Sequence, residues 1–382
     1  MRKIVCLLLV LGMLPLCLNA CKEKLPDSLS STYTYTSRVK GISANEVVCW
    51  DNYILTESKS CVYDRTTGEI TYGGFCEDPE CDGYCFLEKG KMTFVDVSNG
   101  RAYFNVIYGK EIIYGYRDLI SGDAKVLTTI SFEEMLPNRP TYLDGEWLYY
   151  ARKMLREGGN PDVAEDYTAH LCRIHKDGGK EEVAYRLRGD SETMLAIADG
   201  VMFSYFESKI WRVDMERGEP MMLHDMTSSE IDAIGSLKYL DGFLYFFGGA
   251  GVVRMDAQNG QWTYLLDADT ANFVITNDAV YYSKSSTWQV NDPVKYPLDS
   301  EEAVVLHVEP TLYICDLNGE NSRVAWTDPS RSMSFNRGYT VIDGVYYGWI
   351  TQFDFESNQF GETFFTEIHF DTGEIIPATV VE

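Results

Sequence analysis

The sequence is poor in the residues and motifs on which most catalytic and metal sites are built. It has only five histidines, none at metal-ligand spacing, and it lacks the Gly-x-Ser-x-Gly, His-Glu-x-x-His and P-loop motifs. Its 58 acidic residues guarantee pairs of carboxylates by chance, so no acid–base pair stands out. We therefore predict no catalytic residue, no metal ligand and no cofactor.

Long apolar runs are also scarce. The main one, Ile4 to Leu18, follows Arg2 and Lys3, and its length of about 15 residues is short of the roughly 20 that a membrane-spanning helix needs. Pro15 interrupts it. A basic start, a short apolar run and small residues before a cysteine are the layout of a signal peptide, so we expect a cleaved leader.

The end of this leader, Leu18-Asn19-Ala20-Cys21, resembles the lipobox of bacterial lipoproteins. The resemblance implies that the leader is cut before Cys21 and that Cys21 receives a diacylglycerol, whose two acyl chains give stable anchoring. The alternative is simple secretion, with Cys21 as an ordinary thiol. We expect a signal peptide over 1–20, a tether over 21–31 and an extracytoplasmic domain over 32–382. The domain would be anchored to a bacterial membrane, at the cell surface or on the periplasmic face.

Positive charge is scarce as well. Removing Arg2 and Lys3 from the 33 basic residues leaves 31 against 58 acidic ones, a formal charge of −27. Such a surface repels nucleic acid, so we expect no nucleic-acid partner. Acidic character also suits disordered chains, but 45% apolar and 13% aromatic residues predict a globular protein.

Helical periodicity is rare, and a repeat takes its place. A turn containing Asp or Asn, often with Gly, is followed at once by an aromatic-rich strand, with a mean spacing of about 49 residues that matches a propeller blade. The seven copies begin at Asp51, Asn99, Asp144, Asp199, Asp241, Asn277 and Asp343. We predict an all-β chain, a β-propeller of about seven four-stranded blades, with six or eight as alternatives. The chain from Thr32 could complete the last blade.

A second turn, of the form Asp-x-x-x-Gly or shorter, recurs within the units, as from Asp214 to Gly218 and from Asp256 to Gly260. These Asp residues could be mistaken for calcium ligands, but a calcium site needs several oxygen ligands converging from one loop. We interpret them as hairpin turns, in which Gly supplies positive φ and Asp bonds the turn backbone.

The Asp-Gly-aromatic strand followed by a strand such as Lys209 to Asp214 resembles a known domain. It is similar to the low-density-lipoprotein-receptor-related β-propeller domain found, with unknown function, in many bacterial lipoproteins. The resemblance covers most of the chain and implies an extracytoplasmic propeller. It brings no reaction and no catalytic residue.

The cysteines that follow Cys21 are odd in number, which leaves at least one thiol without an internal partner. Three of them, Cys76, Cys81 and Cys85, share a short segment that resembles the Cys-x-Asp-Pro-x-Cys-x-His pattern of Clostridia-type surface lipoproteins, with Gly83 in place of histidine. Zinc takes four Cys or His ligands, so we favour disulfides over a metal. The candidates are Cys49, Cys61, Cys76, Cys81 and Cys85.

Cys61, Cys172 and Cys315 fall on the third strands of their units. Cysteines at such positions are more often small buried hydrophobes than reactive groups. We therefore expect these three to pack in the core, and for Cys61 this expectation stands beside that of a disulfide.

The longest insertions fall between the second and third strands of three units, over 152–169, 283–310 and 350–362. This link emerges on the same face of every blade, so the three loops would crown one face. Aromatic side chains there could stack on sugars or anchor a partner, and basic ones could hold an acidic ligand. The alternative is that the aromatic side chains pack the loops onto the propeller. The candidate ligand-binding residues are Arg152, Arg156, Trp288, Tyr296, His307, Phe353 and Phe355.

Together these features predict a surface-anchored, non-catalytic propeller that binds a glycan or protein ligand. Two rivals keep the same scaffold. A polysaccharide-active enzyme, a glycosidase or a lyase, would need a deep cleft with carboxyl groups of perturbed pKa. A scaffold component of an envelope assembly would expose a large apolar patch.

The lipid anchor can be tested by replacing Cys21. We expect Cys21→Ser to abolish incorporation of radiolabelled fatty acid in a bacterial host and to move the protein from the membrane fraction to the soluble one, because the acylated thiol is gone. Cys49→Ser is the matched control and should leave both unchanged. Retention of the label in Cys21→Ser would contradict the anchor.

Overall fold

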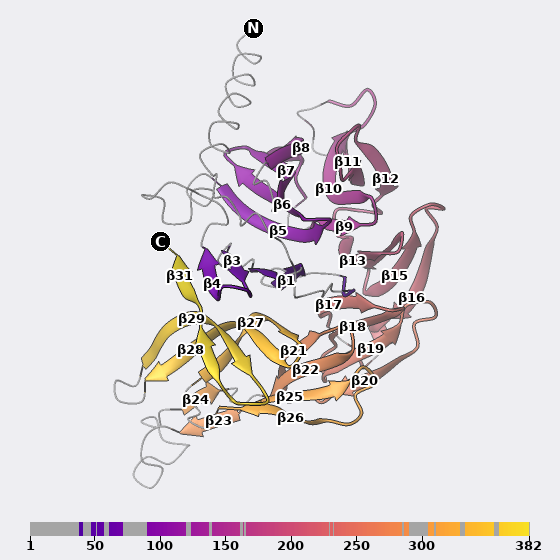
Figure 1. Cartoon of the computed structure of the whole chain (residues 1–382). Coiled ribbons are helices and arrows are strands. Elements are labelled where there is room, and N and C mark those ends of the chain that lie inside the picture. The colour runs from indigo at the N-terminus through magenta and orange to yellow at the C-terminus, as the bar shows by residue number, and fades with distance from the viewer. Residues whose placement is uncertain are drawn as a thin grey trace. The chain divides into compact units, whose positions relative to one another are not determined.

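A computed structural model of the chain describes these residues: 38–40, 47–50, 52–56, 61–71, 90–119, 124–136, 140–160, 163, 166–228, 230–231, 233–284, 286–289, 305–308, 311–328, 333–354 and 359–381. Side chains are not described for every residue within these strands. The described part is almost entirely β-structure, with two short 3₁₀ segments (Figure 1). No helix in it is long and apolar enough to cross a membrane. The predicted segments 1–20 and 21–31 lie outside these ranges.

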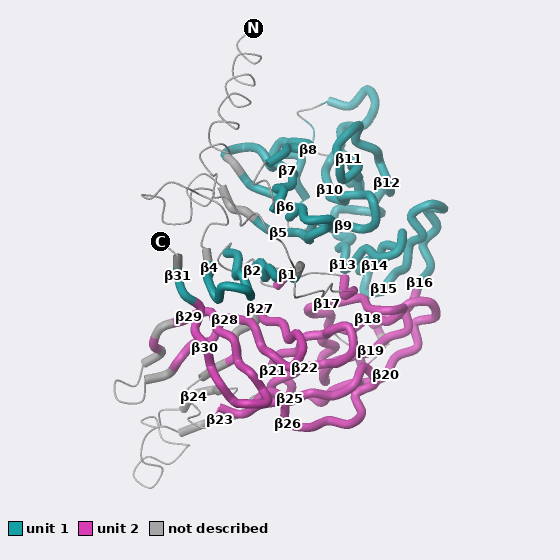
Figure 2. Tube along the Cα trace, in the orientation of Figure 1, with its two compact units in different colours: residues 1–36, 48–222, 379–382 teal, residues 37–47, 223–378 magenta. Residues whose placement is uncertain are grey.

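The chain divides into two compact units (Figure 2). Unit 1 comprises residues 1–36, 48–222 and 379–382, and unit 2 comprises 37–47 and 223–378.

Four successive antiparallel sheets belong mainly to unit 1. Their strands are β1 (Val47–Trp50), β2 (Tyr53–Thr56), β3 (Cys61–Asp64) and β4 (Glu69–Thr71); β5 (Gly90–Ser98), β6 (Arg101–Tyr108), β7 (Glu111–Asp118) and β8 (Ala124–Ser131); β9 (Tyr142–Asp144), β10 (Trp147–Leu155), β11 (Tyr167–His175) and β12 (Glu182–Arg186); and β13 (Thr193–Ala198), β14 (Val201–Phe206), β15 (Lys209–Asp214) and β16 (Pro220–Asp225).

Three further sheets of four strands belong to unit 2. Their strands are β17 (Gly235–Leu240), β18 (Phe243–Phe247), β19 (Val252–Asp256) and β20 (Trp262–Leu266); β21 (Thr270–Ile275), β22 (Ala279–Lys284), β25 (Thr311–Asp316) and β26 (Arg323–Thr327); and β27 (Met333–Ile342), β28 (Val345–Asp354), β29 (Gln359–His369) and β30 (Ile375–Pro377). The prediction of an all-β chain with seven four-stranded blades is confirmed.

The predicted repeat marks the second strand of every blade. Each of the seven turn motifs leads into β2, β6, β10, β14, β18, β22 or β28. Asp199 and Gly200 have φ of 53° and 73°, as a two-residue hairpin turn with both central residues left-handed requires. The plain-turn interpretation also holds for the second motif, because the Asp214 carboxylate accepts the backbone N–H groups of Glu216 and Arg217 at 3.0 and 3.1 Å.

The expectation that the chain from Thr32 completes the last blade was wrong. β29 and β30 pair through the turn at Asp371, so residues 333–377 supply all four strands of this blade. A strand contributed by such a short turn costs little loop-closure entropy. Instead, a later strand, β31 (Thr379–Val381), pairs in parallel with β4 and gives the first blade a fifth strand.

Aromatic side chains fill the space between consecutive blades of unit 2. Trp326 on β26 meets Phe335 on β27 edge to face, with ring centroids 5.8 Å apart. Within the last blade, Tyr346 on β28 stacks on Tyr339 of β27, with ring centroids 5.0 Å apart. Each such pair adds about 0.5–1.5 kcal/mol beyond area burial. Inner strands are correspondingly apolar, and in β22 every residue before Lys284 is buried.

Strands extend into all three predicted insertions. β10 and β11 remain paired as far as Leu155 and Tyr167, and β28 and β29 as far as Asp354 and Gln359. Part of the third insertion forms a separate hairpin of β23 (Ser286–Gln289) and β24 (Val305–Val308). The aromatic and β-branched residues there favour extended pairing, which the loop interpretation overlooked.

The described cysteines, Cys49, Cys61, Cys172 and Cys315, are all buried thiols, and no disulfide joins any of them. The predicted disulfides lie within the segment of Cys76, Cys81 and Cys85 or join it to Cys49 or Cys61, and they stay a prediction. Cys61 packs with its Sγ 2.8 Å from the hydroxyl oxygen of Thr56, at the end of β2 that pairs with β3. The expected packing of Cys61, Cys172 and Cys315 on third strands is confirmed. Cys76, Cys81 and Cys85 lie outside the described residues.

The fourth blade contains an ion pair with a fully buried carboxylate. Glu192 has no exposed surface and accepts hydrogen bonds from the Arg188 guanidinium at 2.6 Å and from the Ser204 hydroxyl at 2.7 Å. The backbone N–H of Arg188 donates to the other carboxylate oxygen at 2.7 Å. Because both carboxylate oxygens accept hydrogen bonds, the free-energy cost of removing this charge from water is offset.

Removal of this carboxylate should be strongly destabilising. We expect Glu192→Ala to lower the free energy of unfolding by about 3–5 kcal/mol, because it leaves a partly buried guanidinium without its partner. Urea unfolding measures the change. The matched control, Glu182→Ala, breaks the exposed pair with Arg173, where the Glu182 side chain is 49% exposed, and should cost less than about 1 kcal/mol. Equal effects of the two variants would contradict the role of Glu192.

Candidate functional site

A groove of about 630 Å³ opens on unit 2 beside the β19–β20 hairpin. It is lined by one histidine, two aromatic rings, one arginine and several polar side chains or glycine: His224, Phe243, Arg254, Asp256, Asn259, Gly260, Gln261, Trp262 and Thr263. Concave sites that combine rings with a few polar groups are the usual form of a small-molecule site.

The turn of this hairpin forms one wall of the groove. The Asp256 carboxylate accepts the backbone N–H groups of Gln258 and Asn259 at 2.8 and 3.1 Å, which fixes the turn. Gly260 has φ of 73°, and a Cβ there would lie 2.0 Å from the carbonyl oxygen of Leu223. Only glycine permits this close approach of the turn to β16, which places His224 at the groove.

Trp262 is held by two perpendicular ring contacts. Its ring centroid lies 6.0 Å from that of His224 and 5.3 Å from that of Tyr264, with interplanar angles of 82° and 81°. Burial lowers the pKa of His224, against a smaller opposing effect of Asp225. The imidazole is therefore neutral at pH 7, which suits its packing against an aromatic ring.

Arg254 lies flat against the ring of Phe243, with its guanidinium carbon 3.5 Å from the ring centroid. The guanidinium also hydrogen-bonds to the Tyr245 hydroxyl, whose pKa is raised by burial. Its Nε is buried without a hydrogen-bond partner. No described carboxylate lies within ion-pair distance of it. The groove therefore holds a fixed cation whose charge the described residues leave unbalanced.

The predicted ligand-binding residues do not line this groove. Arg152 donates to both oxygens of Glu181 at 3.0 Å and to Glu134 at 2.8 Å, so its charge is already matched by two carboxylates. Arg156 is exposed where the β10–β11 hairpin ends, and its backbone N–H donates to Asp166.

The other predicted ligand-binding residues lie where side chains are not described. Trp288 is placed in β23, His307 in β24 and Phe353 in β28. Tyr296 and Phe355 lie outside the described residues altogether. Binding by these five remains a prediction.

The groove was not predicted because all candidate ligand-binding residues were taken from the long insertions. Of the lining, only the turn from Asp256 to Gly260 was singled out from the sequence. The available signal was a tryptophan on an outermost strand, beside exposed Gln261 and Thr263, where a solvated strand would ordinarily carry polar residues.

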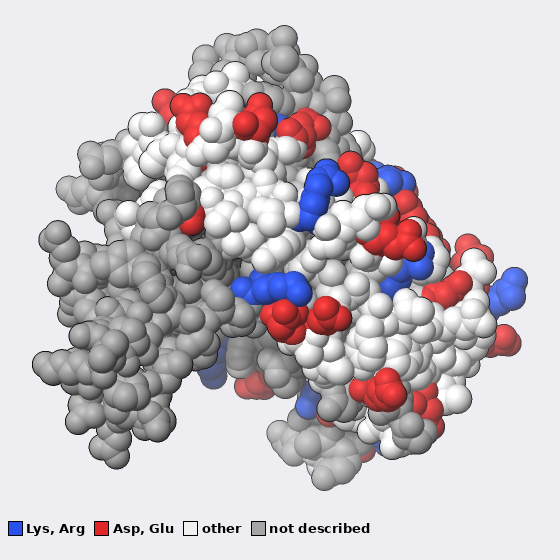
Figure 3. Space-filling view, turned by 90° about the horizontal axis from the view of Figure 1, so that it is seen from below, with Lys and Arg blue, Asp and Glu red and all other residues white. Residues whose placement is uncertain are grey.

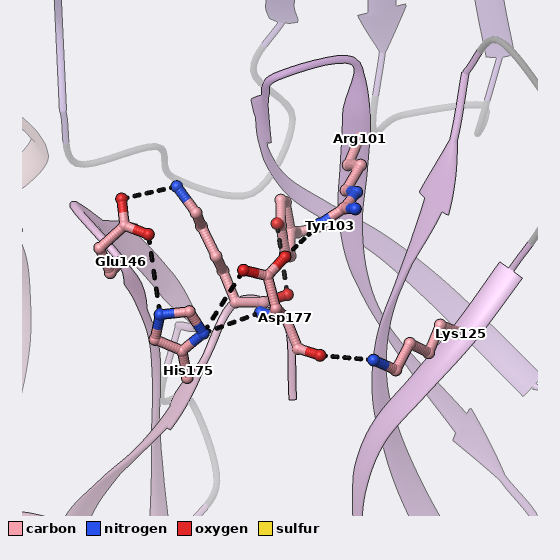
Figure 4. A network of polar contacts seen from close by, with 7 residues as sticks. Arg101, Tyr103, Lys125, Glu146, His175 and Asp177 are labelled. Carbon is pink, nitrogen blue, oxygen red and sulfur yellow. Dashed lines mark hydrogen bonds and ion pairs between the residues drawn. The ribbon is translucent and has the colours of Figure 1, made fainter. Parts of the chain in front are cut away.

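One cluster in unit 1 has the composition of a metal site. Ligand atoms of Glu146, His175 and Asp177 all lie within 4.8 Å of one another (Figure 4). The β9–β10 turn supplies Glu146, and the end of β11 and the turn after it supply the other two. Two carboxylates and an imidazole could in composition hold zinc.

The hydrogen bonds of this cluster do not fit a metal. The backbone N–H of Asp177 donates to His175 Nδ1 at 3.2 Å, and His175 Nε2 faces Glu146 at 3.7 Å. Lys176 binds the Glu146 carboxylate at 2.7 Å, and Arg101 binds that of Asp177. The hydrogen bond from Arg101 is the main cause of a lowered Asp177 pKa. Cations of the chain itself therefore occupy the positions of a metal.

Divalent metal ions should consequently leave the protein unaffected. We expect millimolar calcium or zinc to leave the melting temperature unchanged relative to EDTA, because an ion would have to displace Lys176 and Arg101 from their carboxylates. Differential scanning fluorimetry measures this. A metal-dependent rise in melting temperature that His175→Gln abolishes would contradict the interpretation, whereas a rise retained in His175→Gln would point to binding elsewhere.

No known protein family and no curated protein sequence matches this chain. Its fold is similar to that of solved peptidases. A prolyl endopeptidase gives a TM-score of 0.53 at 11% identity, over 90% of this chain and 50% of that one. The acylaminoacyl peptidase of Pyrococcus horikoshii gives 0.52 at 13% identity, over 91% and 53%. This chain thus spans about half the length of these peptidases. At such identities the likeness shows the fold alone, and the chain is a β-propeller of seven four-stranded blades.

Proposed function

We propose that this protein is an exported, lipid-anchored propeller that binds a polar, ring-containing ligand without transforming it. The observation that carries the proposal is the groove of unit 2, where two aromatic rings, an arginine and the side chains of Asn259 and Gln261 line one concave surface. Rings offer apolar faces to a ligand, and the amides offer both donors and acceptors. Cys21 would hold the domain at the membrane.

A binding role agrees with the electrostatics of the described residues. An acid–base enzyme of the glycosidase type needs a carboxyl group whose pKa is raised. The shifts at Asp177 and Asp214 are in the opposite direction, lowered chiefly by hydrogen bonds from Arg101 and from the backbone of Arg217. On the face shown in Figure 3, most basic side chains lie beside acidic ones. This pairing makes the unbalanced charge of Arg254 unusual.

The apolar surface gives less support to a role in an assembly. The exposed large apolar side chains that are described are spread over several elements of the fold, and only Met221 and Met222 share one, β16. They are Phe132, Leu155, Val183, Met221, Met222, Val324, Ile376 and Val380. Such scattered exposure is normal for a soluble domain and supports binding through the groove over docking through an apolar face.

A glycan array probed with the full chain in detergent tests this function. We expect Trp262→Ala to weaken capture about tenfold, the effect of losing about 1.4 kcal/mol of stacking. Phe132→Ala, which removes a 49% exposed ring outside the groove, is the matched control and should bind normally. Circular dichroism verifies that both variants are folded.

A variant lacking residues 286–308 separates this groove from the face predicted by the insertions. Capture that survives this deletion and is lost in Trp262→Ala supports the groove. Capture lost only with the deletion would contradict the groove and locate binding at the β23–β24 hairpin. Absence of capture by the unaltered chain would count against a glycan-binding function.

A further inference from the structure

We propose that the groove of unit 2 selects sugars that carry a carboxylate, and that Arg254 binds this carboxylate. This inference rests on the proposed binding function and adds the chemical class of the ligand. It follows from how differently Arg254 is held from the other well-packed arginines of the described chain.

Three of those arginines lie against an aromatic ring and also bind a glutamate or aspartate. Arg188 lies over Trp211 and pairs with Glu192, and Arg173 lies over Trp147 and pairs with Glu182. Arg101 lies over Tyr116 and pairs with Asp177. In each case the ring orients the guanidinium and a carboxylate neutralises it.

Arg254 also lies against an aromatic ring, but no described carboxylate pairs with it. The Phe243 ring lies 3.5 Å from its guanidinium carbon, the shortest such distance among these arginines. Its described polar contact is to a neutral hydroxyl, that of Tyr245. A carboxylate from a ligand would complete the arrangement that the other three arginines make within the chain, as the bidentate geometry of guanidinium and carboxylate allows.

The rest of the groove indicates a sugar rather than a bare anion. The strand register puts Arg254 opposite both Tyr245 and Thr263, so Thr263 projects on the same side of the sheet. The Thr263 hydroxyl and the exposed Gln261 amide can exchange hydrogen bonds with hydroxyl groups. Trp262, the neighbour of Thr263 in β20, projects to the opposite side of the sheet but also lines the groove with its apolar ring. A carboxylated sugar ring presents the hydroxyls, the apolar face and the charge that these groups match.

The charged groups of the lining favour an acidic ligand. His224 is neutral because burial lowers its pKa, so Arg254 is the one full positive charge in the lining. The Asp256 carboxylate, in the same lining, already accepts two backbone N–H groups and is committed to its turn. An acidic ligand therefore meets one fixed cation and a carboxylate whose charge is partly dispersed into the backbone.

Isothermal titration calorimetry with the full chain in detergent tests the inference. The probes are a galacturonate trisaccharide, the galactose trisaccharide of the same linkage, and inorganic phosphate. We expect the acidic sugar to bind at least about tenfold more tightly than the neutral one, as a charge-assisted hydrogen bond allows. We expect Arg254→Gln to remove that preference, so that the affinities for the two sugars differ by less than about twofold.

Two further variants distinguish recognition of the carboxylate by Arg254 from a general effect of the positive charge of the protein. Arg254→Lys keeps the charge but not the planar fork, and should retain only part of the preference. Arg212→Gln removes one positive charge from β15, outside the groove, and should leave the preference intact.

Each result has a distinct meaning. Equal affinity for the acidic and the neutral sugar overturns the carboxylate inference while the proposed binding function stands. Tight phosphate binding that competes with the acidic sugar overturns the sugar part, leaving a plain anion site. Failure of both sugars to bind, while the unaltered chain is folded by circular dichroism, overturns the inference and the groove together.

Discussion

The fold depends on a carboxylate that accepts the backbone N–H groups of its own turn. Asp214, Asp256 and Asp316 each do this with two groups at 2.8–3.1 Å, and Asp64 does so with the N–H of Thr66 at 2.7 Å. Each such bond closes a hairpin between the third and fourth strands of a blade. Because this turn recurs from blade to blade, part of the excess of acidic residues serves to fix turns. An acidic side chain in this chain is therefore no sign of a cation site by itself.

The periodic part of the structure could be predicted from the sequence. The motifs at Asp199 and Asp241 specify local turns with positive φ, and the aromatic strands that follow them specify burial on both faces. Both properties depend on a few neighbouring residues, so blade number and strand order could be predicted. The pairing partner of β4 could not be predicted. Ile70 and Val380 pair although they are far apart in the sequence, and no turn motif joins their strands.

The groove was beyond prediction for a related reason. Its Arg254, Trp262 and His224 lie on three different strands, and each alone resembles an ordinary residue of an outer strand. What distinguishes them is the close approach of Gly260 to Leu223 and the missing carboxylate beside Arg254, neither of which has a sequence motif. Conversely, Arg152 was a reasonable candidate from its position, but the structure shows its charge matched by Glu134 and Glu181.

The parallel pairing of β31 with β4 bears on how the chain is made. Without residues 379–381, β4 presents an unpaired strand edge, the kind of surface that recruits strands from other molecules. Chains interrupted before Thr379 would thus expose an aggregation-prone edge that β31 otherwise covers. Because β31 follows the strands of all seven blades in the sequence, it can cover this edge only in molecules in which those blades have already been synthesised.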